Sequence, residues 1–75
     1  MAGRGAARAL AFSPDGQRLA AGTDGGDLAL LDPRTGAVLK RWVLARPVNA
    51  LVFERSGGAL LAGLGSGVAA RIGLD

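Results

Sequence analysis

The feature that most constrains the fold is an internal repeat. An offset of 41 residues places Leu10 on Leu51 and brings nine identical pairs into register. About four would arise by chance in a chain so rich in Ala, Gly and Leu, so position matters more than the count. The matched glycines fall between apolar runs and the matched apolar residues fall within them. A period of this length indicates repeated supersecondary units. The pairs are Ala9/Ala50, Leu10/Leu51, Phe12/Phe53, Gly16/Gly57, Leu19/Leu60, Ala21/Ala62, Gly22/Gly63, Gly26/Gly67 and Ala29/Ala70.

Short apolar runs alternate with turns rich in Gly, Pro and Asp. Proline presets φ for a turn and glycine accepts the conformations that follow, so two segments are predicted structural turns. The runs between turns predict strands of an all-β antiparallel meander. The turn residues are Pro14, Asp15 and Gly16 in the first segment and Asp32, Pro33 and Gly36 in the second. The expected strands are residues 9–12, 18–22, 27–31, 37–44, 48–53, 59–63 and 68–72.

A helical interpretation is possible in two places, because Ala and Leu are good helix formers. Only residues 37–44 and the first dozen residues are considered as helices. Gly or Pro interrupts the rest of the chain too often for a helix of ordinary length. As a strand, residues 37–44 would place Val38, Lys40 and Trp42 on one face.

Residues 9–22, which read ALAFSPDGQRLAAG, resemble the first half of a WD40 repeat. Residues 28–32 lie where that family has the strand ending in Trp-Asp, although Leu31 and Ile72 stand at the Trp positions. The resemblance covers residues 7–75 and implies blades of a β-propeller, each a four-stranded antiparallel meander. It implies a loose tail at residues 1–6, a first repeat at 7–47 and a second, incomplete repeat at 48–75 that lacks its outer strand.

Two blades cannot close a ring, since propellers have about four to eight. The apolar runs would then be exposed at both ends of the pair, which invites pairing with another chain. Three explanations remain open: a fragment of a longer propeller, a chain that self-assembles into a ring, and a chain that folds poorly alone. The partners expected are therefore further propeller blades or copies of the same chain.

Charge and hydropathy exclude several other classes of protein. The net charge is +3, and the nine basic residues are scattered rather than clustered, so a nucleic-acid partner is not expected. No apolar run approaches the length of a membrane span. Arg4 and Arg8 without acidic neighbours faintly resemble a transit peptide, but the expected location is the cytoplasm.

Catalytic and cofactor sites are not expected. The chain has no Cys, His or Tyr, and its aspartates lie at turns, where Asp bonds to the local backbone. Asp24 and Asp27 share a glycine-rich turn, but an EF-hand needs a longer ligand series with a closing Glu. The run 63–67 is similar to a dinucleotide-binding loop, yet its third glycine comes one position early. No metal or cofactor is therefore predicted.

Trp42, flanked by Lys40 and Arg41, is the candidate partner contact, because Trp is enriched in interaction hot spots. The other interpretation is that Trp42 packs on the next blade. The family resemblance implies a non-enzymatic protein-interaction or scaffold module. The alternative is a non-catalytic propeller part of a larger enzyme or regulatory polypeptide.

Overall fold

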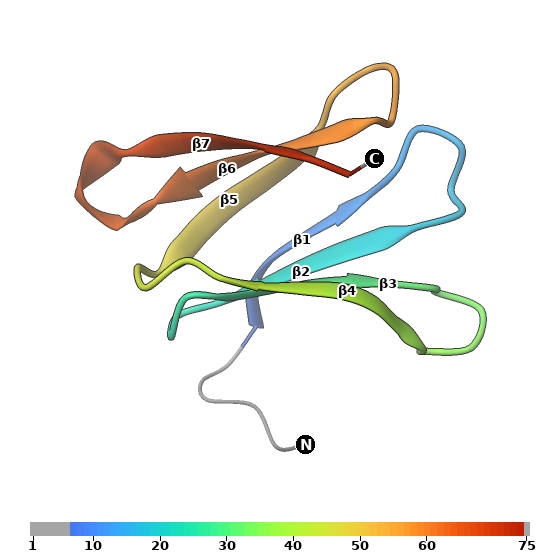
Figure 1. The fold of residues 1–75 in the computed structure, drawn as a ribbon, viewed down its shortest axis with the longest axis horizontal. Helices are drawn as coiled ribbons and strands as arrows, with labels where there is room; N and C mark the ends of the chain where they lie inside the picture. The colour runs from blue at the N-terminus through green and yellow to red at the C-terminus, as the bar shows by residue number, and fades with distance from the viewer. Residues whose placement is uncertain (1–6, 75) are drawn as a thin grey trace.

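The computed structural model describes residues 7–74, which form two antiparallel sheets (Figure 1). The four-stranded sheet has the order β1 (Ala7–Phe12), β2 (Leu19–Thr23), β3 (Asp27–Leu31) and β4 (Val38–Val43). The three-stranded sheet has the order β5 (Val48–Phe53), β6 (Ala59–Leu64) and β7 (Ala69–Gly73), with a short 3-10 turn, Gly65–Gly67, before β7.

The predicted all-β antiparallel fold is confirmed. The helical interpretation of residues 37–44 is wrong, because they form the edge strand β4. The helical interpretation of the first dozen residues is also wrong from Ala7 onward, because this part of the chain forms β1. The predicted tail at 1–6 lies outside the described residues. Expected and observed strand ends differ by at most two residues, as is usual for element ends.

The two sheets share one pairing register at the 41-residue offset. Ala9 pairs with Gly22 in the first sheet, and Ala50 pairs with Gly63 in the second. Both opening strands also carry a bulge one residue earlier, at Arg8 and at Asn49. A bulge is a specific irregularity of a strand, so its recurrence shows that the repeat extends to backbone detail.

A further bulge in β4 alters the faces of that strand. Leu30 pairs with Lys40 but Leu31 pairs with Val38, so Leu39 is the extra residue. Paired residues share a face and neighbours along a strand do not. The expectation that Val38 shares a face with Lys40 and Trp42 is therefore wrong, because the bulge reverses the alternation between them.

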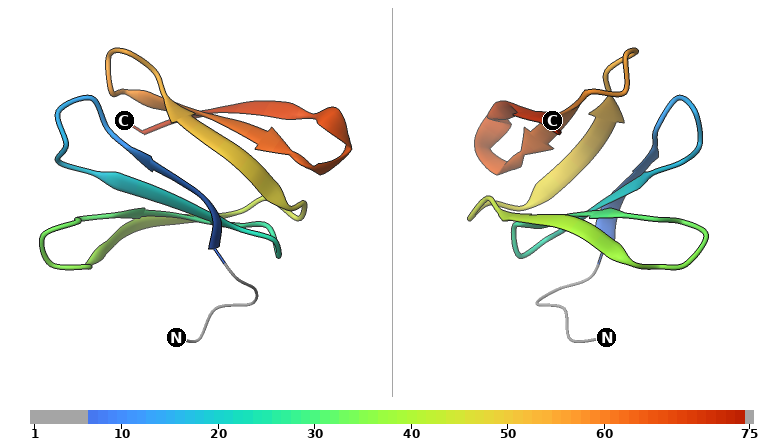
Figure 2. Two further views of the ribbon diagram at one scale, coloured as in Figure 1. Left: turned by 180° about the vertical axis from the view of Figure 1, so that it is seen from behind. Right: turned by 45° about the vertical axis from the view of Figure 1, so that its right-hand side comes forward.

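The sheets pack face to face, with β5 lying along β1 and β2 (Figures 1 and 2). Their contact forms one apolar core, in which Leu28, Val48 and Leu60 are the largest fully buried side chains. Close approach depends on Gly22, because a Cβ there would lie 2.6 Å from Val48 Cβ. The core residues are Ala9, Ala20, Leu28, Leu30, Val48, Leu51, Phe53, Leu60, Ala62, Leu64 and Leu74.

The far side of the four-stranded sheet is largely apolar, and no part of residues 7–74 covers it. Leu10 and Phe12 are each 63% exposed, and Val43 is 70% exposed. Such side chains lose favourable burial energy, on the order of 25 cal/mol per Å² of apolar surface left in water. The packing of the chain is thus complete between the sheets and incomplete outside them.

Candidate functional site

Three turns gather at one end of the two sheets and form the candidate binding rim. They are the β1–β2 turn (13–18), the β3–β4 turn (32–37) and the β5–β6 turn (54–58). Successive antiparallel strands reverse direction, so alternate turns meet at the same end (Figures 1 and 2). Turns positioned by a rigid scaffold commonly carry binding functions.

An open cleft of about 290 Å³ separates the β1–β2 and β5–β6 turns. Its two walls are equivalent segments of the repeat. Their backbones match: Ser13 N–H donates to Arg18 O at 2.9 Å, and Glu54 N–H donates to Ala59 O at 2.9 Å. The cleft is lined by Ser13, Pro14, Asp15, Arg18, Ser56, Gly57 and Gly58.

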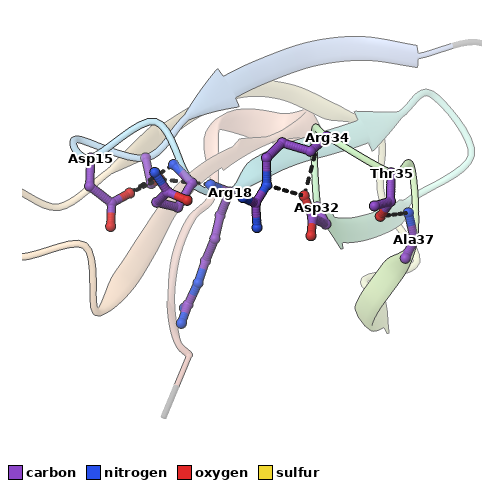
Figure 3. A network of polar contacts seen from close by, with 8 residues as sticks. Asp15, Arg18, Asp32, Arg34, Thr35 and Ala37 are labelled. Atoms are coloured by element: carbon purple, nitrogen blue, oxygen red, sulfur yellow. Dashed lines mark hydrogen bonds and ion pairs between the residues drawn. The ribbon is translucent and has the colours of Figure 1, made fainter.

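Asp15 fixes the β1–β2 turn, which forms one wall of the cleft (Figure 3). Its Oδ1 accepts a hydrogen bond from Ser13 Oγ at 2.6 Å and one from the Gln17 N–H at 2.9 Å. These bonds, led by the Ser13 hydroxyl, hold the pKa of the Asp15 carboxyl below its ordinary value. Gly16 completes the turn with φ +74°, which a residue with a Cβ rarely adopts.

The β3–β4 turn is fixed in the same way by its own side chains. Asp32 Oδ1 accepts the Arg34 N–H at 2.9 Å, and Thr35 Oγ1 accepts the Ala37 N–H at 3.2 Å (Figure 3). Gly36, at φ +78°, donates to Asp32 O at 2.7 Å. Arg34 is left 79% exposed and lies 3.7 Å from the Asp32 carboxylate, which makes it available to a partner.

The β5–β6 turn uses a different device. Arg71 donates to both carboxylate oxygens of Glu54, at 2.6 Å from Nε and 3.0 Å from Nη2. This pairing lowers the pKa of Glu54 and raises that of Arg71. Sequence reasoning missed the pair, because the two residues are 17 positions apart and meet only through the pairing of β5, β6 and β7.

The structure does not bring the three candidate contact residues together. Trp42 is half-buried, pairs with Leu28 and packs against the core between the sheets. Lys40 lies on the same face, and its Nζ donates to Leu74 O at 2.6 Å. Arg41 is exposed on the opposite face. These residues therefore do not form one aromatic and basic patch.

Replacing Lys40 by methionine is expected to lower the free energy of unfolding by about 0.5–1.5 kcal/mol, the usual net value of one hydrogen bond. Methionine keeps the aliphatic part of the side chain but cannot donate to Leu74. Urea denaturation measures the change. Arg41→Met is the matched control, since Arg41 points away from the second sheet. An equal loss in both variants would contradict a specific role for the Lys40–Leu74 bond.

Residues 7–74 contain neither a metal-binding cluster nor a membrane-spanning helix. No group of three or more His, Cys, Asp or Glu side chains is placed to hold a metal ion. None of the helical structure there has the length and apolar character needed to cross a membrane.

Comparison with known proteins gives one partial match. No protein-family model matches the sequence. The chain is 53% identical over 38 residues to human WD repeat-containing protein 81, and this match covers 51% of the chain. It covers 2% of the human protein, so the chain corresponds to a very small part of that relative. The match supports the resemblance to WD repeat proteins over about half of the sequence.

The rim carboxylates predict how stability depends on pH. Folding lowers the pKa of Asp15 and of Glu54, so their stabilising effect is complete above the ordinary pKa values of 3.8 and 4.5. It is lost as the pH falls through the lower pKa values of the folded chain. The midpoint of thermal unfolding is therefore expected to fall below about pH 4.5.

The double variant Asp15→Asn, Glu54→Gln is expected to flatten this pH profile and to be less stable than the wild type at pH 7. Ser13→Ala should flatten it partly, since it removes the strongest donor to Asp15. Circular dichroism melts between pH 7 and pH 3 test both. A double variant with the wild-type slope would show that these two groups do not determine the acid sensitivity.

Proposed function

We propose that this chain supplies WD40-like propeller blades to a non-enzymatic protein-interaction surface. The observation that carries the proposal is the 38-residue match to a WD repeat-containing protein. The fold supports it, because two equivalent antiparallel sheets stack face to face as neighbouring blades do in a propeller.

The rim of turns is the surface proposed for contact. Three carboxylates hold its turns: Asp15 and Asp32 accept hydrogen bonds from nearby backbone N–H groups, and Glu54 accepts from the Arg71 side chain. A surface that is ordered before binding loses less conformational entropy when a partner docks. Arg34 and Arg55 are exposed on two of the turns, and arginine is enriched in interaction hot spots. The cleft between equivalent turns would receive a side chain or a short loop of the partner.

Affinity purification with the immobilised chain, followed by quantitative mass spectrometry, tests this proposal. Arg34→Ala and Arg55→Ala remove exposed guanidinium groups from the rim, and Arg46→Ala removes one from the opposite end. A bound protein that contacts the rim should lose about tenfold in affinity with each rim variant, on the order of 1.4 kcal/mol. It should bind the Arg46 variant normally. Equal binding to all three variants would overturn the assignment of the rim.

A further inference from the structure

The four-stranded sheet has an exposed face whose equivalent is buried in the three-stranded sheet. Its side chains on β1, β2 and β3, here called the open face, are Leu10, Phe12, Leu19, Ala21, Ala29 and Leu31. On the same side, β4 adds Val38, Arg41 and Val43. Forty-one residues later stand Leu51, Phe53, Leu60, Ala62, Ala70 and Ile72, which pack against the four-stranded sheet. Five of these six pairs are identical and the sixth exchanges Leu for Ile.

Identity between the repeats is concentrated on this face. Five of the nine identical pairs belong to it, and three of the others are glycines. Phe53 is 8% exposed and Phe12 is 63% exposed, although both occupy the same position of the same strand. The open face therefore has the side chains of a packing surface, and residues 7–74 contain no counterpart packed on it.

The structure also shows what that counterpart looks like. The buried face of the three-stranded sheet packs on Ala9, Ala11, Ala20, Gly22, Leu28 and Leu30. The positions equivalent to these form the rear face of the three-stranded sheet: Ala50, Val52, Leu61, Gly63, Ala69 and Arg71. Val52 and Leu61 are 57% and 45% exposed. A mostly apolar face, in which Arg71 paired with Glu54 stands in the place of Leu30, is thus present on every copy of the chain.

Gly63 gives an independent indication of the same contact. Gly22 is required within the chain because the side chain of Val48 occupies the space where its Cβ would lie. Gly63 is its equivalent, yet a Cβ there would meet Ala50 Cβ at 3.6 Å and no other atom within 4 Å. A glycine at this position suits close approach of a second chain, whose Ala7 is the equivalent of Val48.

We propose that the open face of one copy docks on the rear face of a second copy, repeating the packing seen between the two sheets. The two faces differ, so the contact is head to tail. Such contacts either close into a ring or extend without limit. With two sheets per chain, a ring of about four to eight blades would contain about two to four chains. This inference goes beyond the proposed function and does not depend on a partner at the rim.

Native mass spectrometry and light scattering of the purified chain test the proposal. The wild type should form one discrete closed oligomer of two to four copies. Phe12→Glu on the open face and Val52→Glu on the rear face should each give a folded monomer. Gly63→Val should also give a folded monomer. The valine side chain has room in the single chain but would block the close approach of a second chain. Val68→Glu is the control, since Val68 is 42% exposed in the β6–β7 turn and lies on neither face.

Mixing two variants decides the polarity of the contact. Phe12→Glu retains an intact rear face and Val52→Glu retains an intact open face, so the mixture should form a dimer with one copy of each. A contact between two open faces would instead leave Val52→Glu dimeric by itself and overturn the head-to-tail arrangement. A wild-type monomer with exposed faces, or an assembly that neither Phe12→Glu nor Val52→Glu disrupts, would overturn the second copy as the occupant.

Discussion

Replacing Phe53 by alanine is expected to remove roughly half of the folding stability of this chain. Phe53 is 8% exposed and lies in the core between the sheets. Truncating a buried Phe to Ala costs about 3–5 kcal/mol, through lost burial and the cavity left behind. The whole chain is expected to have a free energy of unfolding of about 4–11 kcal/mol, from typical values per residue. Phe53→Ala should therefore lower the midpoint of urea denaturation to roughly half of the wild-type value.

The matched control is Phe12→Ala, at the equivalent position of the first repeat. Phe12 is 63% exposed in the single chain, so its removal should change the unfolding free energy of the monomer by less than about 0.5 kcal/mol. Urea denaturation in dilute solution measures both variants, because dilution keeps the chain monomeric. Similar losses at the two positions would contradict the asymmetric burial of the repeats.

The architecture was largely predictable, because it depends on local signals that the sequence carries directly. Pro14, Asp15 and Gly16 mark the first turn, and the structure places a turn there. In the equivalent β5–β6 turn, Gly57 has φ +77°, although Glu54, Arg55 and Ser56 stand where the first repeat has Ser-Pro-Asp. The glycine at the position of positive φ is sufficient to preserve the backbone, so the β5–β6 turn keeps the geometry of the β1–β2 turn.

The pairing of side chains across the sheets was not predictable in the same way. The bulge at Leu39 places Val38 on the other face by shifting the register between β3 and β4, and no residue type in β4 indicates a bulge. The Glu54–Arg71 pair and the Lys40–Leu74 bond join positions far apart in sequence. For Trp42 the sequence left open a partner contact or packing on the next blade, and its pairing with Leu28 turns it toward the core between the sheets. Each case depends on register, which is fixed by the packing of whole sheets.

Gly22→Ala is expected to produce the second large loss, from the smallest possible change in the side chain. A Cβ at this position would lie 2.6 Å from Val48 Cβ and closer still to Val48 Cγ1. Val48 is fully buried and begins β5, so relief requires the sheets to move apart. Overpacking of this kind costs about 1–3 kcal/mol. Differential scanning calorimetry should show an unfolding midpoint about 4–24 °C below that of the wild type.

A double-mutant cycle with Val48→Ala identifies the cause of this loss. Val48→Ala alone leaves a cavity, and the added methyl at position 22 should partly fill it. The two changes together should therefore cost less than their sum, with a coupling of about 0.5–3 kcal/mol. Strict additivity would mean that Gly22→Ala acts through the backbone and not through Val48.

The repeat supplies the contrasting variant Gly63→Ala. Its Cβ would make an ordinary contact with Ala50 at 3.6 Å. Alanine also restricts the unfolded chain more than glycine does, which stabilises a protein by about 0.4–1 kcal/mol where the native conformation is compatible. The same substitution should therefore destabilise the chain at Gly22 and stabilise the monomer slightly at Gly63. The difference arises because one glycine already has a sheet packed on it and its equivalent does not.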